Sequence, residues 1–222
     1  MVAVLLIVAG YLLGSIPSAY LVARLAKGID IRDYGSRTVS TSSVLVHVGR
    51  AAAVVVAAMD LAKGALPPAL ALAAGLGRPV AVLAGLATTV GHNWSVFLRF
   101  QGGRGLGTSI AMLFVVAWRE ALILGVIFVI GSLLGAGPTV ALLAILGLPL
   151  LTWALGEPLE IVAGTVAIAM LVVLKRLLAH DFLRDIPTDR RWEVLRYRLL
   201  LDRDIRDERT WVERRPQQTR KE

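Results

Sequence analysis

The chain has 222 residues, of which 56% are hydrophobic and 18% charged, and its mean hydropathy is +0.70. A water-soluble domain of this size would expose too much apolar surface at that ratio, so the composition favours an integral membrane protein. The net charge of +8 lies mostly between or after apolar runs, which favours anionic lipid or phosphate partners over nucleic acid. The chain has no cysteine, and its three histidines lack metal-ligand spacing, so no metal site is predicted.

Seven apolar runs predict an all-α integral membrane protein with about seven transmembrane helices. The fourth and fifth runs are shorter than the roughly 20 residues that a full crossing needs, so five crossings plus a hairpin remain an alternative. Either count places the N-terminus outside and the C-terminus in the cytoplasm, in agreement with the basic loops. The runs are Val2–Leu25, Val44–Ala74, Val80–Leu98, Leu106–Trp118, Ala121–Leu134, Thr139–Leu155 and Leu159–Leu174.

Two proline-containing stretches are expected to disturb these helices. Gly14-Ser15-Ile16-Pro17-Ser18 should loosen or kink the first run, which is tolerated where neighbouring helices satisfy the freed backbone. Pro67-Pro68 should bend the second helix, or end its regular part.

Asp60 and Lys63 are charged residues inside the second apolar run. A charge within the membrane costs roughly 2.5–3.5 kcal/mol on insertion scales, so such residues usually turn inward and pair. Their spacing of three lets them meet on one helix face. A structural ion pair and a direct functional role both remain open for them.

The last 48 residues form a polar appendage, with 14 of the 24 Lys and Arg residues and 10 of the 16 acidic ones. We therefore divide the chain into a membrane domain, residues 1–178, and a charged cytoplasmic tail, residues 179–222. Trp192, Leu195 and Leu199 recur at helical spacing, so Arg190–Arg215 is expected to be a helix, either along the membrane surface or solvated.

The most polar stretch between apolar runs is Gly91–Ser109. Its glycines allow a close approach of backbone to ligand, and their N–H groups can face an anion. The order of residues matches neither the P-loop nor the dinucleotide fingerprint. We interpret the stretch as a site for a phosphate-bearing ligand at the mouth of a helical bundle.

Three cytoplasmic stretches should meet at one end of the bundle, because they alternate with apolar helices. They are Lys27–Ser43, Gly91–Ser109 and the start of the tail. Within the first, the hydroxyl run Ser40–Ser43 is typical of a plain helix cap and also suits an anion. Together the stretches offer cations, neutral donors and one group that titrates near neutrality, which suits a ligand with two negative groups. The candidate residues are Ser36, Arg37, His92, Asn93, Arg104, Lys175 and Arg176.

His180 and Asp185 have the spacing of the H-x4-D motif of acyl-CoA-dependent acyltransferases. Two residues at one spacing match often by chance, and a polytopic apolar body does not belong to that fold, so we assign no role to this pair.

Several motifs, in order and at natural spacing over roughly residues 1–178, resemble the bacterial acyl-phosphate-dependent glycerol-3-phosphate acyltransferases. The resemblance implies a seven-span inner-membrane enzyme of phospholipid biosynthesis. Such an enzyme moves a fatty acyl group from acyl phosphate to the 1-hydroxyl of glycerol 3-phosphate and forms lysophosphatidic acid, with no metal or cofactor. The motifs are Gly14-Ser15-Ile16-Pro17-Ser18, Lys27-Gly28-Ile29-Asp30-Ile31-Arg32, Gly35-Ser36, Asp60-Leu61-Ala62-Lys63-Gly64, Gly91-His92-Asn93 and Gly102-Gly103-Arg104-Gly105.

The resemblance also implies roles for individual residues. Ser36, beside Gly35, would bind phosphate, and His92 and Asn93 would orient the reacting groups, so that His92, Asn93 and Ser36 form the catalytic set. Gly102, Gly103 and Gly105 would hold phosphate, with Arg104 where the family usually has lysine, and Lys175 resembles part of the end of the third motif.

The chain departs from the family pattern in two motifs. In the first, both asparagines are replaced, and Val46 stands where the family has arginine, so Arg37 is expected to supply that charge from nearby. In the third, Met170-Leu171-Val172-Val173 replaces the usual His-Arg-Glu-Asn. Two alternatives to the acyltransferase stay open: a diverged relative that binds a phosphorylated lipid or uses another acceptor, and a small membrane transporter or scaffold.

Overall fold

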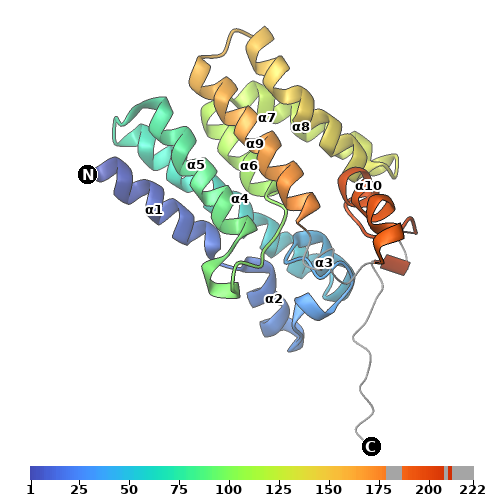
Figure 1. Cartoon of the computed structure of the whole chain (residues 1–222). Helices are drawn as coiled ribbons and strands as arrows, with labels where there is room; N and C mark the ends of the chain where they lie inside the picture. Colours follow the sequence, from blue (N-terminus) through green and yellow to red (C-terminus); the bar gives the residue numbers. More distant parts are fainter. Residues whose placement is uncertain (179–186, 208–209, 212–222) are drawn as a thin grey trace, which may run out of the picture.

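A computed structural model describes residues 1–178, 187–207 and 210–211, and within these the only extended pairing is an isolated bridge between Ser95 and Gln101. The chain is otherwise built from helices and turns (Figure 1). The α-helices are α1 (Val2–Ser15), α2 (Ser18–Lys27), α3 (Thr41–His47), α4 (Arg50–Ala73), α5 (Gly77–Asn93), α6 (Leu106–Val116), α7 (Trp118–Leu133), α8 (Gly137–Ala154), α9 (Leu159–Leu177) and α10 (Arg191–Leu201). Short 3-10 turns are η1 (Ile31–Asp33), η2 (Val96–Leu98) and η4 (Thr188–Arg190).

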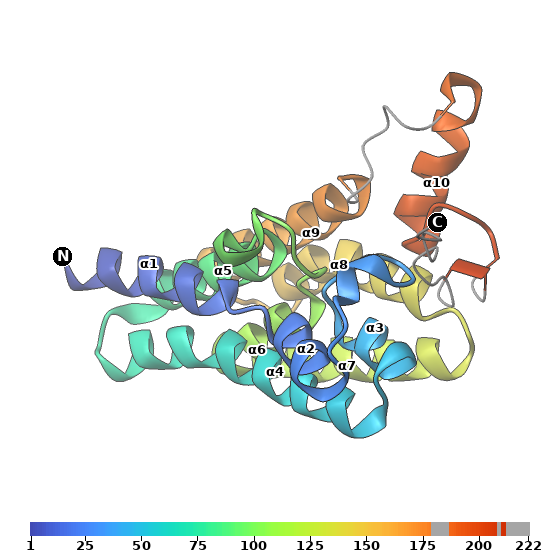
Figure 2. The same ribbon diagram turned by 90° about the horizontal axis from the view of Figure 1, so that it is seen from below.

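The long helices α1 and α4 to α9 lie side by side in one bundle (Figures 1 and 2). The short helices α2 and α3 and the loop between α5 and α6 gather at one end, which we call the loop end. The helix α10 contacts α8 and α9 near the same end. At the opposite end, Arg119 pairs with Glu157 at 2.5 Å and ties the α6–α7 turn to the α8–α9 turn.

Close contact between α1 and α5 depends on small residues. A side chain at Gly14 would strike the backbone of Thr88, and one at Gly91 would strike the carbonyl of Tyr11. Such small-residue contacts let two backbones approach, which is how helices commonly associate in membranes. The packing fixes the end of α5, where His92 lies, against the end of α1.

Three helical segments of the described chain are long and apolar enough to cross a membrane, by length and composition. They are Val2–Lys27, Arg50–Ala73 and Gly137–Ala154. Large apolar side chains on the outward faces of the bundle are widely exposed, for example Val54, Val126 and Trp153. A surface of this kind suits lipid, because contiguous apolar patches of this extent are rare on soluble monomers.

Helix boundaries differ from the sequence expectation at three places. The kink predicted at Pro17 is a full break between α1 and α2. The second run is two helices, since Gly49, with φ of 136°, separates α3 from α4. Of the two outcomes expected at Pro67-Pro68, an end of the regular helix is excluded, because both prolines lie inside α4, which continues to Ala73. Helices α1, α5 and α6 contact α4, and both prolines are buried, a setting in which a proline inside a membrane helix is tolerated.

Candidate active site

The break between α1 and α2 exposes backbone carbonyls at the loop end, and Lys63 of α4 occupies the gap. Its Nζ donates to the carbonyl of Ile16 at 2.9 Å and to Ser18 Oγ at 3.4 Å. The same Nζ lies 2.8 Å from Asp60 Oδ1. Both charged side chains are buried. Lys63 therefore serves two functions at once: it caps a broken helix, and its charge is balanced by a carboxylate one turn away.

A small polar pocket opens beside this lysine. It is formed by the helix break, the end of α5 and the loop that follows, and it has a histidine on one wall. Asp60 Oδ1 lies 3.7 Å from His92 Nδ1, which is within ion-pair range but long for a hydrogen bond. A carboxylate on that side favours a proton on Nδ1 and leaves Nε2 as an acceptor. The lining residues are Gly14, Ser15, Ile16, Pro17, Ser18, Ala19, Val39, Lys63, His92, Ser95, Gly102 and Gly103.

The glycines of the loop after α5 are explained by how tightly it packs on the end of that helix. A side chain at Gly102 would strike the carbonyl of His92, and one at Gly103 would strike His92 Nε2. Gly105 has φ of +76°, and a side chain there would approach Asn93 Oδ1 to 2.7 Å. The N–H of Gly103 donates to the carbonyl of His92 at 3.0 Å, so that amide is already used. The glycines thus let the loop pack closely against His92 and Asn93 and hold them in place. This role is separate from any contact that the glycines make with an anion.

Several buried polar atoms near the site lack a hydrogen-bond partner within the described residues, and two of the groups that carry them face the ligand region. One is the Ser15 hydroxyl, which lines the pocket, and the other is the Asn93 side-chain amide. Both side chains are fully buried. Unpaired buried polar atoms are costly in a native protein, and a bound polar ligand or water commonly satisfies them. Ser15 and Asn93 are therefore candidate ligand contacts.

Ser36 lies outside the pocket lining, in a cluster of hydroxyls at the start of α3. Its Oγ lies 2.5 Å from Thr38 Oγ1 and 3.1 Å from Ser43 Oγ, and Ser40 Oγ lies 3.0 Å from Ser43 Oγ. Ser40 also accepts from the Ser43 N–H, as a helix cap does. Val39, between these hydroxyls, does line the pocket. The cluster therefore adjoins the pocket through its backbone.

Of the neighbouring residues that were predicted to bind substrate, Gly35 and Arg37 both have positive φ, of 52° and 56°. Arg37 is exposed, whereas Gly35 is buried. They form the turn that carries Ser36 and do not line the pocket.

Arg104 and Lys175 point to backbone carbonyls and do not line the pocket. Arg104 Nη1 donates to the carbonyl of Lys175 at 3.0 Å. Lys175 Nζ donates to the carbonyl of Asn93 at 2.5 Å and lies 5.1 Å from the centre of the Trp94 ring. Arg176 donates to the carbonyls of Leu199 and Pro138. The three predicted stretches thus meet at one end of the bundle, as expected, but Arg104, Lys175 and Arg176 each donate to backbone carbonyls.

Sequence reasoning left Lys63 undecided and did not single out Ser15 or Ser18 as site residues. The signal that could have found them was the conjunction of a proline break in one apolar run with a buried charge in the next. His180 and Asp185 lie outside the described residues.

A second hollow adjoins the pocket and is entirely apolar. It lies between α1, α4 and η2, and Ile16 lines both hollows. Leu12, Leu70 and Phe97 line it and are each about half exposed, so it opens on the outer face of the bundle. The site therefore joins a hydrogen-bonding pocket lined by Lys63 and His92 to an apolar groove, which suits a ligand with a polar head and a hydrocarbon chain.

Known proteins resemble this chain in both sequence and fold. The family profile described as glycerol-3-phosphate acyltransferase matches residues 4–181. The chain belongs to the glycerol-3-phosphate acyltransferase family. Glycerol-3-phosphate acyltransferase 5 of Dehalococcoides mccartyi is 38% identical over 221 residues, covering 96% of this chain and 94% of the relative. The glycerol-3-phosphate acyltransferase of Synechococcus sp. strain CC9902 is 40% identical over 182 residues, which cover 79% of this chain and 91% of the relative.

The fold is also similar to a solved acyltransferase. The crystal structure of PlsY, an integral membrane glycerol 3-phosphate acyltransferase, in its glycerol 3-phosphate form has a TM-score of 0.76 to this chain and 27% sequence identity. The similarity covers 95% of this chain and 98% of that one. Its lysophosphatidic acid form has a TM-score of 0.74. The family assignment and the membrane fold thus agree between sequence and structure.

Proposed function

We propose that this acyltransferase transfers a fatty acyl group from acyl phosphate to glycerol 3-phosphate, giving lysophosphatidic acid and inorganic phosphate. One observation carries the proposal: the polar pocket with Lys63 and His92 adjoins an apolar groove at Ile16. The pocket suits phosphate and the groove suits an acyl chain. Relatives named for glycerol 3-phosphate and a neighbour solved in its glycerol 3-phosphate form support the acceptor.

The chemistry asks for positioning and for charge neutralisation, because acyl phosphate is already an activated mixed anhydride. The acceptor oxygen attacks the acyl carbon, the bond from that carbon to the phosphate oxygen breaks, and phosphate leaves with its electron pair. His92 Nε2, with Nδ1 turned to Asp60, is suited to receive the hydroxyl proton. A phosphate oxygen of a substrate is a second acceptor for the same proton.

We assign the remaining roles by position. Lys63 neutralises a phosphate in the pocket beside Gly102 and Gly103, Asn93 orients a reacting group through its unpaired amide, and Ser36 binds a second phosphate from the hydroxyl cluster. Arg104 and Lys175 support the site through their contacts with backbone. The family resemblance further implies that these two residues, and also Gly35, Arg37 and Gly105, contact substrate directly.

We place the protein in a bacterial inner membrane as a multi-pass enzyme of about seven spans. Residues 1–178 form the acyltransferase body, and residues 179–222 form a cytoplasmic tail. The N-terminus lies outside. Support comes from the positively charged residues of the loop end, including Arg24, Lys27 and Arg104, because basic loops stay in the cytoplasm.

The test is turnover by the purified full chain in a bilayer mimetic, supplied with acyl phosphate and glycerol 3-phosphate. We expect equal release of inorganic phosphate and lysophosphatidic acid. His92→Ala should lower kcat/KM by about 100- to 1,000-fold, because it removes a positioned proton acceptor. Ser36→Ala should also lose turnover, and His180→Ala should not. Activity that depends on His180, or turnover with acyl-CoA in place of acyl phosphate, would contradict the assignment.

A second acceptor is favoured by the replaced first motif, in which serine and threonine hydroxyls cluster where the family has asparagines. Hydroxyls accept and donate in different directions from amides, so this cluster suits another phosphorylated alcohol. Running the same assay with a panel of phosphorylated acceptors decides this: a higher kcat/KM for another acceptor would replace glycerol 3-phosphate.

A further inference from the structure

The tail helix α10 docks on the loop end by an exchange of helix-end contacts. Arg198, only 2% exposed, pairs with Asp204 at 2.5 Å and donates to the carbonyl of Leu177 at the end of α9. In return, Arg176 of α9 donates to the carbonyl of Leu199 at the end of α10. Carbonyls in the last turn of a helix lack partners within the helix, so each helix here satisfies the other. The docking is a specific polar interface.

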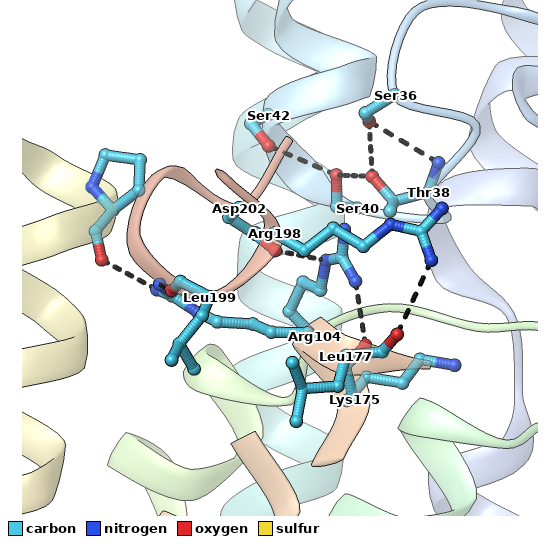
Figure 3. A network of polar contacts seen from close by, with 12 residues as sticks. Ser36, Thr38, Ser40, Ser42, Arg104, Lys175, Leu177, Arg198, Leu199 and Asp202 are labelled. Carbon is cyan, nitrogen blue, oxygen red and sulfur yellow. Dashed lines mark hydrogen bonds and ion pairs between the residues drawn. The ribbon is translucent and has the colours of Figure 1, made fainter. Parts of the chain in front are cut away.

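One tail residue reaches further, into the loop that borders the pocket. Asp202 Oδ1 lies 3.0 Å from Arg104 Nε, and Arg104 also donates to the carbonyl of Lys175 (Figure 3). The Asp202 side chain is 23% exposed and that of Arg104 is 17% exposed, so solvent screens this pair only partly. Asp202 lies beyond residues 4–181, which match the family profile.

Arg104 connects this contact to the pocket by two routes. Along the chain, it follows Gly103, which lines the pocket and packs against His92. Across space, its hydrogen bond holds Lys175, whose Nζ donates to the carbonyl of Asn93 next to His92. Whatever fixes the Arg104 guanidinium therefore fixes the glycine-rich loop and the end of α5 together.

The local charge also needs a carboxylate at this point. Arg104, Lys175 and Arg176 bring three cations to the end of α9. The pairing of Arg104 with Asp202 offsets part of that repulsion. Asp202 ends α10 in the left-handed conformation, with φ of 56°, which favours glycine, asparagine and aspartate over other side chains. Of these three, aspartate alone carries the charge that Arg104 requires.

We propose that Asp202 is a positioning residue for the acyl transfer. It acts through Arg104, and it holds Gly102 and Gly103 where they present the pocket to a substrate phosphate. The inference rests on the proposed function. It makes the tail a working part of the enzyme.

The test is a double-mutant cycle of Asp202→Asn and Arg104→Gln in the full chain. Asparagine suits the backbone at 202, so the change removes charge without strain. Asp202→Asn should raise the KM for glycerol 3-phosphate or acyl phosphate about three- to tenfold with kcat within about twofold, since phosphate contacts act in ground and transition states alike. In the Arg104→Gln background, Asp202→Asn should change KM by less than about twofold.

The matched control is Glu193→Gln, which removes the same charge from α10 and whose side chain contacts Arg190 and Tyr197. Its kinetics should equal those of the parent. A second readout without turnover is the rise in unfolding temperature caused by glycerol 3-phosphate, which Asp202→Asn should reduce. If the parent binds but makes no lysophosphatidic acid, the proposed function fails and this readout still tests Asp202.

Three results would overturn the inference. The first is an Asp202→Asn enzyme with parental KM values. The second is an effect of equal size with and without Arg104, which would show that Asp202 only stabilises α10. The third is a lower KM in Asp202→Asn, which would show that the tail carboxylate competes with phosphate for Arg104 instead of holding it in place.

Discussion

Lys63 and Lys175 are both buried lysines at the same end of the bundle, yet their surroundings give them different work. Lys63 lines the pocket, and its charge is matched by Asp60 at 2.8 Å. Lys175 does not line the pocket; its Nζ donates to the carbonyl of Asn93 and lies over the ring of Trp94. Each lysine also donates to a backbone carbonyl, Lys63 to that of Ile16, so the two differ in whether they line the pocket and in whether a carboxylate lies beside them.

The largest effect should come from removing the pocket lysine. Lys63→Met should lower kcat/KM by about 100- to 1,000-fold, because a preorganised cation is lost from the pocket while the buried Asp60 loses its lysine partner. Lys175→Met should cost about tenfold or less, since Lys175 does not line the pocket and its Nζ contacts only the Asn93 carbonyl and the Trp94 ring among the described residues. Steady-state assays of both variants, with unfolding temperatures to confirm folding, make the measurement. Equal losses would remove the distinction drawn between the two lysines.

A smaller effect should follow from crowding the pocket wall. Gly103→Ala would place a methyl group against His92 Nε2, so kcat/KM should fall about 10- to 100-fold. Gly107→Ala is the matched control, because a side chain there meets nothing closer than Asp60 Cβ at 4.0 Å. It is the second residue of α6, where alanine fits a helical backbone and should leave turnover unchanged. Should both variants keep parental rates, the loop does not position His92.

The smallest effect is expected at the opposite end of the bundle. Arg119 pairs with Glu157 there, but its side chain is 47% exposed, and pairs of that kind contribute roughly 0–1 kcal/mol. Arg119→Gln should therefore leave kcat/KM within about twofold and lower the unfolding temperature slightly. A turnover defect as large as that of Gly103→Ala would mean that the catalytic geometry is not confined to the loop end.

Much of the fold follows from the sequence, because apolar runs bounded by glycines and charges specify helices through local physics. The break at Pro17 was predicted as a kink on the same grounds. The course of α4 through Pro67 and Pro68 was not, because neighbouring helices decide whether a proline ends a helix. The separation of α3 from α4 depends on the backbone angle of Gly49, which a run of apolar residues hides.

The candidate site was less predictable than the fold. His92, Gly102 and Gly103 could be singled out from one polar stretch. The place of Lys63 could not, since it depends on a carbonyl 47 residues away that only the packing of α1 on α4 brings near. The same is true of Asp202 and Arg104, which no spacing rule connects. Contacts of this range are set by how elements pack.

Ile16, the residue that ends α1, belongs to both hollows. Under the proposed function, a donor with a hydrocarbon chain enters the groove from the bilayer, whereas a water-soluble acceptor reaches the pocket from the aqueous phase. Donor and acceptor then meet where the groove joins the pocket at Ile16. The hydrocarbon chain stays in lipid and the acceptor stays in water until the ester bond forms. The product, with one fatty tail and one phosphate, is then already oriented as a membrane lipid and can leave by the route the donor took.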